Sequence, residues 1–160
     1  MRTRTSRRAL LASPLAASAL HAQDLLSRAE TELLAALCEQ IIPADQDPGA
    51  RETGAVRFIV KQLAGPHKRH LAAYRQGLRE IRPDFLKLSF DEQTAYLKTI
   101  ESTPFFQLLI DHTMQSYYGH PHHGGNRDGA SWKMLRIDTH MGKGHWHGPQ
   151  TASQTKTGAR

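Results

Sequence analysis

Histidine is the residue type in this chain with the clearest capacity for chemistry, because neutral imidazole is a common ligand of zinc, copper and haem iron. Seven of the ten histidines in the 160 residues fall between positions 112 and 147, and five of them form the groups His120-x-His122-His123 and His145-Trp146-His147. Histidines two positions apart on a loop do not by themselves give tetrahedral geometry, and no carboxylate recurs at a fixed offset from them. The spacing therefore predicts polar loop and tail histidines with no metal site. The alternative interpretation of these histidines is that the chain is a freestanding periplasmic His-rich protein that binds a metal ion.

The sequence contains no set of residues that predicts catalysis. The sequence has no G-x-S-x-G motif, no phosphate-binding loop and no G-x-G-x-x-G fingerprint. Cys38, the single cysteine, lies on an apolar helical stripe without a charged activator, so we expect a small buried core residue. Asp45 and Asp47 resemble the start of a calcium loop, but its twelfth position is Val56, where a bidentate glutamate is needed. A small enzyme in its own right is a second alternative, for which no nucleophile or acid–base pair is evident.

The first 22 residues have the pattern of an export signal. A positive segment containing Arg2, Arg4, Arg7 and Arg8 precedes a short, mildly apolar segment rich in Ala and Ser. Ala17-Ser18-Ala19 is the first candidate cleavage signal, and Leu20-His21-Ala22 is the second. Ser6-Arg7-Arg8, followed by one residue and two apolar ones, resembles the twin-arginine consensus, and that route carries folded cargo. We therefore expect residues 1–22 to address a periplasmic protein to the twin-arginine translocase. The alternatives are that they form an ordinary secretory signal or a disordered basic tail.

Removal of this leader would lower the formal net charge of the chain. The whole chain has 21 Lys and Arg against 15 Asp and Glu, a formal charge of +6. Four basic residues and no acidic ones lie in residues 1–22, so the remainder carries 17 against 15, or +2. Because counterion release needs clustered basic side chains, we expect no nucleic-acid partner.

The body that follows the leader is predicted to be helical. Apolar residues recur at spacings of three and four, and no segment shows the alternation of a strand. Ser27–Glu30 and Ser89–Glu92 match capping boxes, and Thr103-Pro104 matches a cap with a first-turn proline. Pro43, Gly65, Pro83 and Gly119 mark helix ends, Pro66 is the expected first residue of the helix with Tyr74 and Leu78, and residues 44–54 are expected to be loop.

These elements predict an all-α protein, an irregular bundle of about five helices in residues 23–137. A Gly/His-rich loop follows Gly119, in which Gly124-Gly125-Asn126 predicts a tight turn, since Gly and Asn tolerate positive φ. Residues 131–135 could form a last short apolar anchor. Residues 138–160 are poor in apolar side chains and are expected to form a flexible tail.

Several of these segments together resemble one protein family. They are Leu37–Asp45, Gln62–Pro66, Tyr74-Arg75-x-Gly77-Leu78, Phe105-Phe106 with His112-Thr113, and Gly124–Gly129 with Trp132. Over about residues 30–137 the chain resembles the subunit 3 family of gluconate 2-dehydrogenase, and the Gly-Gly-Asn block followed by Trp132 is the most specific part. The His-rich tail after Asp138 lies outside the pattern.

The resemblance implies a non-catalytic small subunit of a dehydrogenase complex. Its partner would be a large FAD-bearing subunit of the glucose-methanol-choline type, with a multihaem cytochrome c that accepts the electrons and anchors the complex at the membrane. The large subunit often lacks a leader, so the small one exports it as a folded pair. FAD and haem are then expected in the partners, with no cofactor in this chain. The resemblance also implies that the large subunit determines which sugar or polyol is oxidised.

Two segments are candidate partner-binding surfaces under this interpretation, because aromatic anchors often dominate interfaces. The loop candidates are Gly124, Gly125, Asn126, Arg127, Asp128 and Trp132. The helix candidates are Phe105, Phe106, Tyr117 and Tyr118, of which Phe105 and Phe106 also suit the core.

Overall fold

The computed structural model describes residues 25–137 and contains no strand in that range, which confirms the predicted all-α class. The α-helices are α2 (Arg28–Ile41), α3 (Ala50–Thr53), α4 (Ala55–Ala64), α5 (Leu71–Glu80), α6 (Phe90–Ile100), α7 (Pro104–Tyr118) and α8 (Ala130–Met134). Short 3-10 helices are η1 (Lys68–His70), η2 (Phe85–Lys87), η3 (Pro121–His123) and η4 (Arg127–Gly129). The five longest helices, α2 and α4 to α7, are those indicated by the apolar spacing. Arg7, Arg8 and the tail histidines lie outside the described residues.

The three predicted helix caps, Ser27, Ser89 and Thr103, are confirmed. The backbone N–H of Ser27 donates to the Glu30 carboxylate at 2.7 Å, and Ser27 Oγ accepts from the Glu30 N–H at 3.2 Å. Ser89 and Glu92 repeat this capping box at the start of α6. Thr103 caps α7, whose first residue is Pro104. Each cap satisfies backbone donors that the helix itself leaves without partners, an effect of about 1 kcal/mol.

The segment expected to be a loop, residues 44–54, contains the short helix α3. The carboxylate of Glu39 accepts the N–H groups of Ala44 and Arg51, each at 3.0 Å, and so fixes both ends of the connection. Gly54, with a φ of 91°, then ends α3 and begins α4. The composition of this segment correctly indicated turns, but a contact from Glu39 of α2 stabilises a helical turn within it.

Pro66 is not the first residue of a helix. Residues 65–67 form a turn, η1 follows, and α5 begins at Leu71. The N–H of His67 donates to the carbonyl of Gln62 at 2.8 Å, and the His67 ring contacts His112 of α7. The turn therefore directs the His67 ring toward His112.

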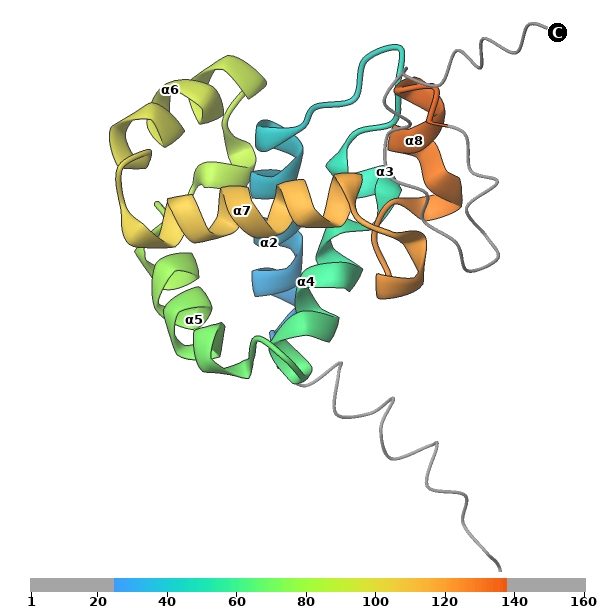
Figure 1. The fold of residues 1–160 in the computed structure, drawn as a ribbon. Coiled ribbons are helices and arrows are strands. Elements are labelled where there is room, and N and C mark those ends of the chain that lie inside the picture. The colour runs from blue at the N-terminus through green and yellow to red at the C-terminus, as the bar shows by residue number, and fades with distance from the viewer. Residues whose placement is uncertain (1–24, 138–160) are drawn as a thin grey trace, which may run out of the picture.

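The core lies where α7 crosses α2 and α4, with α6 above and α5 below the N-terminal end of α7 in Figure 1. One apolar cluster joins these helices, and its fully buried large side chains are Leu34, Leu37, Ile59, Leu63, Tyr74, Phe85 and Leu109. Cys38 is buried as predicted, with Sγ 3.5 Å from Thr113 Oγ1. Burial raises the pKa of this thiol to about 12, so it stays protonated and unreactive at neutral pH.

None of the helices within residues 25–137 is both long enough and apolar enough to cross a lipid bilayer.

Candidate functional site

The loop between α7 and α8 is organised by one buried side chain, Asn126. Its Nδ2 donates to the carbonyl of Gly119 at 2.9 Å, and its Oδ1 accepts from the N–H of Ser131 at 3.1 Å. Asn126 has a φ of 43°, a left-handed conformation that Asn tolerates better than most residues. The side chain therefore ties the end of α7 to the beginning of α8.

Close backbone contact explains the glycines of the same loop. A Cβ on Gly125 would overlap the backbone carbonyl of Ser116, and Gly124 has a φ of 106°. Ser131 Oγ donates to the carbonyl of Tyr117 at 2.6 Å, so α8 is held directly against α7. The predicted tight turn at Gly124-Gly125-Asn126 is confirmed, and its residues shape the loop from within.

Helix α4 supports the loop from the other side. Arg57 Nε donates to the carbonyl of Gly124 at 2.9 Å, and Lys61 Nζ donates to the carbonyl of His122 at 3.3 Å. With its backbone held in this way, the loop presents the exposed side chains of Arg127 and Asp128. Of the six predicted loop residues, Gly125 and Asn126 are buried, Gly124 and Trp132 are partly exposed, and Arg127 and Asp128 are exposed.

Three of the four predicted helix aromatics serve packing within the chain. Phe106 and Tyr117 are buried, and Tyr117 Oη donates to the carbonyl of Pro48 at 2.9 Å. Phe105 is half-buried and packs directly over Gly77 of α5, where a Cβ would overlap its ring. Tyr118 alone stands out from the helix, with 40% of its surface exposed.

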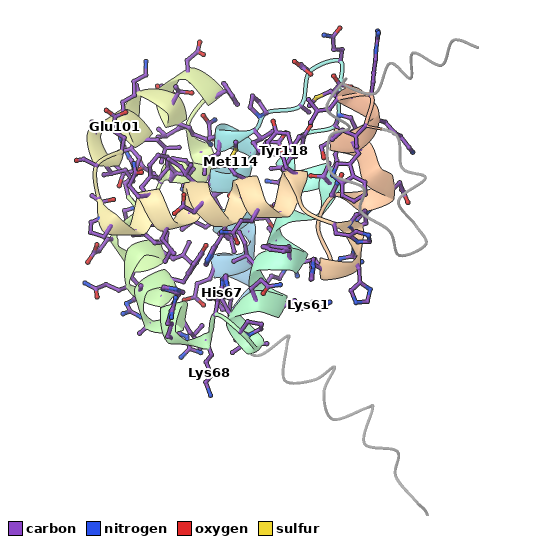
Figure 2. The ribbon with its side chains drawn as sticks, in the orientation of Figure 1. Lys61, His67, Lys68, Glu101, Met114 and Tyr118 are labelled. Carbon is purple, nitrogen blue, oxygen red and sulfur yellow. The ribbon has the colours of Figure 1, made fainter. Side chains whose placement is uncertain are left out.

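An exposed apolar stripe runs along α7 beside Tyr118. Ile110, Met114 and Tyr118 are spaced by four residues and share one side of the helix, and Met114 is 41% exposed. Figure 2 shows Met114 and Tyr118 on the same side of α7. Trp132 adjoins the stripe, since its Nε1 donates to the carbonyl of Tyr118 at 2.9 Å. These four residues are called the α7 face below.

A groove continues the α7 face toward α6. It has a volume of about 380 Å³ and lies between the end of α2, α6 and α7. Its lining is Gln40, Ile41, Thr94, Leu97, Lys98, Glu101, Phe106, Ile110 and Met114. Ile110 and Met114 belong to both features, so the stripe and the groove form a continuous apolar surface with a polar margin.

The histidines of the loop do not assemble into a metal centre within residues 25–137. His120, His122 and His123 lie at η3 with ring centroids 5.8–6.5 Å apart. No group of three or more His, Cys, Asp or Glu side chains in the described range is arranged to hold a metal ion. His140, His145 and His147 lie outside that range.

A different histidine pair joins α7 to the turn before η1, with His112 buried in α7 and His67 partly exposed. His112 Nε2 lies 2.9 Å from His67 Nδ1, and His112 Nδ1 lies 2.9 Å from Tyr74 Oη. Both contacts fit a neutral imidazole that accepts from Tyr74 and donates to His67. Burial, together with the nearby His67 and His70, lowers the pKa of His112 to about 4. With both nitrogens engaged and the ring 2% exposed, His112 links α7 to α5 and to the turn before η1.

The protein is a small helical domain in which a loop held by Asn126, Arg57 and Lys61 lies beside a partly exposed apolar face of α7. The chain belongs to the gluconate 2-dehydrogenase subunit 3 family, whose model matches residues 28–138. The match contains the Gly-Gly-Asn loop and the whole α7 face, and it confirms the resemblance found in the sequence. Neither a curated protein nor a solved structure gives a significant match. Family membership implies a small subunit of a gluconate 2-dehydrogenase-like complex.

Proposed function

We propose that this chain is the non-catalytic small subunit of a periplasmic, flavin-dependent sugar or polyol dehydrogenase, and that it supports export and assembly of the large flavoprotein subunit. The observation that carries the proposal is the α7 face, which lies inside the family-matched region. Tyr118, Met114 and Trp132 are residue types enriched in the buried centres of protein interfaces.

The scaffold under the α7 face favours tight binding. Association costs free energy whenever loops and side chains must become ordered. Here Trp132 is positioned by its hydrogen bond to the Tyr118 carbonyl, and the loop before it is held by Asn126 and Arg57. Less ordering is then needed on binding, so more of the free energy of burying apolar surface contributes to affinity.

The redox chemistry belongs to the partners in this proposal. FAD in the large, glucose-methanol-choline-type subunit would oxidise the sugar or polyol, and a multihaem cytochrome c would accept the electrons. The residues of this chain bind and position the large subunit. Arg7 and Arg8 would address the folded pair to the twin-arginine translocase, a route whose acceptance of folded cargo suits a flavoprotein already loaded with its cofactor.

Co-purification tests the binding step. The tagged chain is coexpressed with the large subunit, and FAD absorbance and large-subunit protein are measured in the eluate. The wild-type chain should recover FAD in a near-equimolar amount, and Met114→Ala with Tyr118→Ala should reduce the recovery by about tenfold or more. Leu86→Ala is the control, because Leu86 is an apolar residue that is 47% exposed on η2 and does not belong to the α7 face. Equal recovery by wild type and the double variant would exclude the α7 face as the contact.

A further inference from the structure

We propose that a groove with four arginines at its margin, formed by α2, α3, α4 and η4, binds an acidic segment of the large subunit. The groove has a volume of about 680 Å³ and is a different surface from the α7 face. The inference rests on the proposed function and adds a second contact, recognised by charge.

The four arginines come from four separate elements. Arg28 lies at the start of α2, Arg51 in α3, Arg57 in α4 and Arg127 in η4. All four side chains are exposed, and Glu32 is the one carboxylate in the lining. Four of the nine arginines in residues 25–137 therefore gather at one groove, although the chain without its leader carries a formal charge of only +2.

These guanidinium groups have no carboxylate partner within the described part of the chain. The salt bridge found there joins Arg82 to Asp84, away from the groove. Arg57 contacts the carbonyl of Gly124 through Nε, and no side-chain hydrogen bond is formed by Arg28, Arg51 or Arg127 with other residues in the range 25–137. The groove thus offers planar, bidentate donors that match carboxylates closely.

The floor of the groove favours a polypeptide over a small anion. It is apolar and is formed by Leu26, Ala35, Val56 and Val60. An inorganic anion would contact the arginines and leave this surface exposed to water. A protein segment that carries Asp or Glu next to an apolar side chain would pair its carboxylate with the arginines and bury its apolar side chain against the floor. Arginine and apolar side chains are often found together in protein interfaces.

The groove is also continuous with the loop between α7 and α8. Arg127 belongs to that loop, and Arg57 both lines the groove and holds the loop through Gly124. A large subunit seated on the α7 face, which includes Trp132, would therefore extend an acidic segment past Arg127 into the groove. Such charge complementarity contributes to the association rate and to the choice of partner.

Charge reversal in the full complex tests this inference. Arg28→Glu with Arg51→Glu alters only exposed side chains that form no hydrogen bonds among residues 25–137, so the fold should be retained. The Kd for the large subunit should rise by about 30-fold, and its dependence on salt should become weaker. Lys68→Glu with Arg79→Glu applies the same change in charge outside the groove and should leave the Kd within about twofold. An unchanged Kd for the Arg28 and Arg51 variant would overturn the groove proposal.

A photo-crosslinking side chain at Thr31, in the groove lining, identifies the occupant. The crosslinked peptide of the large subunit should contain Asp or Glu, and a peptide without either would overturn the inference. Gluconate and inorganic phosphate are tested separately for binding to the full chain. The inference would also be overturned if the Arg28 and Arg51 variant loses binding of either anion but keeps the wild-type Kd for the large subunit. If the wild-type chain fails to bind the large subunit, the proposed function itself is wrong. If the wild-type chain binds and the charge-reversed variant binds equally well, only the proposal about the groove is wrong.

Discussion

The side-chain amide of Asn126 donates to the carbonyl of Gly119 across 2.9 Å, and this contact joins the end of α7 to the loop that precedes α8. The same side chain accepts the N–H of Ser131, so one buried residue satisfies backbone groups at two helix ends. Trp132 follows Ser131 directly, and its indole contacts the Tyr118 carbonyl. The position of Trp132 on the α7 face therefore depends on Asn126.

Replacing Asn126 should destabilise the domain through these hydrogen bonds. Asn126→Ala leaves the Ser131 N–H and the Gly119 carbonyl without their partner, and we expect the free energy of unfolding to fall by about 2–3 kcal/mol in urea titrations. Asp128→Ala is the matched control, because Asp128 also has a positive φ of 57° but has an exposed side chain. Equal losses in the two variants would mean that backbone conformation, and not hydrogen bonding, explains the effect.

Trp132 is expected to contribute both a ring and an N–H group to the α7 face. Its ring lies 5.2 Å from that of His120, centroid to centroid, and its Nε1 is bonded to Tyr118. Trp132→Ala should lower recovery of the large subunit by about tenfold in the co-purification assay, and Trp132→Phe, which keeps a ring, should lower it less. His122→Ala alters another exposed loop side chain and should have no effect. Undiminished recovery with Trp132→Ala would restrict the loop to a structural role.

The buried His112 should make the domain less stable in acid. Its pKa is lowered to about 4 in the folded chain, against about 6.5 for free histidine. Well above pH 6.5 the ring is neutral in both states and adds no pH dependence. As the pH falls from 6.5 to 4, the unfolded chain takes up a proton that the folded chain excludes, so the free energy of unfolding falls by up to about 3 kcal/mol.

The contribution of His112 can be isolated by unfolding at pH 7 and pH 4.5. His112→Gln should be less stable than wild type at pH 7 but should lose less stability on acidification. His123→Gln, which replaces an exposed histidine, should keep the wild-type pH dependence. An equally steep loss in His112→Gln would assign the acid sensitivity to other groups.

Local sequence signals predicted the features that depend on neighbouring residues. Ser27, Ser89 and Thr103 begin their helices as expected, since a cap and its partner lie within one turn of each other. The Gly124-Gly125-Asn126 turn was also predictable from local sequence, because Gly and Asn are the residue types that best tolerate the positive φ found at Gly124 and Asn126.

Features that depend on distant residues could not be predicted in this way. His67 and His112 are 45 positions apart, and neither has a distinctive neighbour in the sequence. The four arginines of the groove come from separate elements, so only the fold brings them together. Helical spacing placed Phe106, Tyr117 and Tyr118 on α7 but did not indicate which side the other helices cover. The structure shows that Tyr118 is exposed, whereas Phe106 and Tyr117 are buried.

The distribution of the large subunit between cytoplasm and periplasm tests the central claim most directly. The large subunit is coexpressed with the wild-type chain or with Arg7→Lys plus Arg8→Lys, and both fractions are examined by immunoblot and for bound FAD. The proposed function predicts FAD-loaded large subunit in the periplasm with the wild-type chain, and its retention in the cytoplasm, still bound to this chain, with the double variant. An equal amount of periplasmic large subunit in both cases would contradict it.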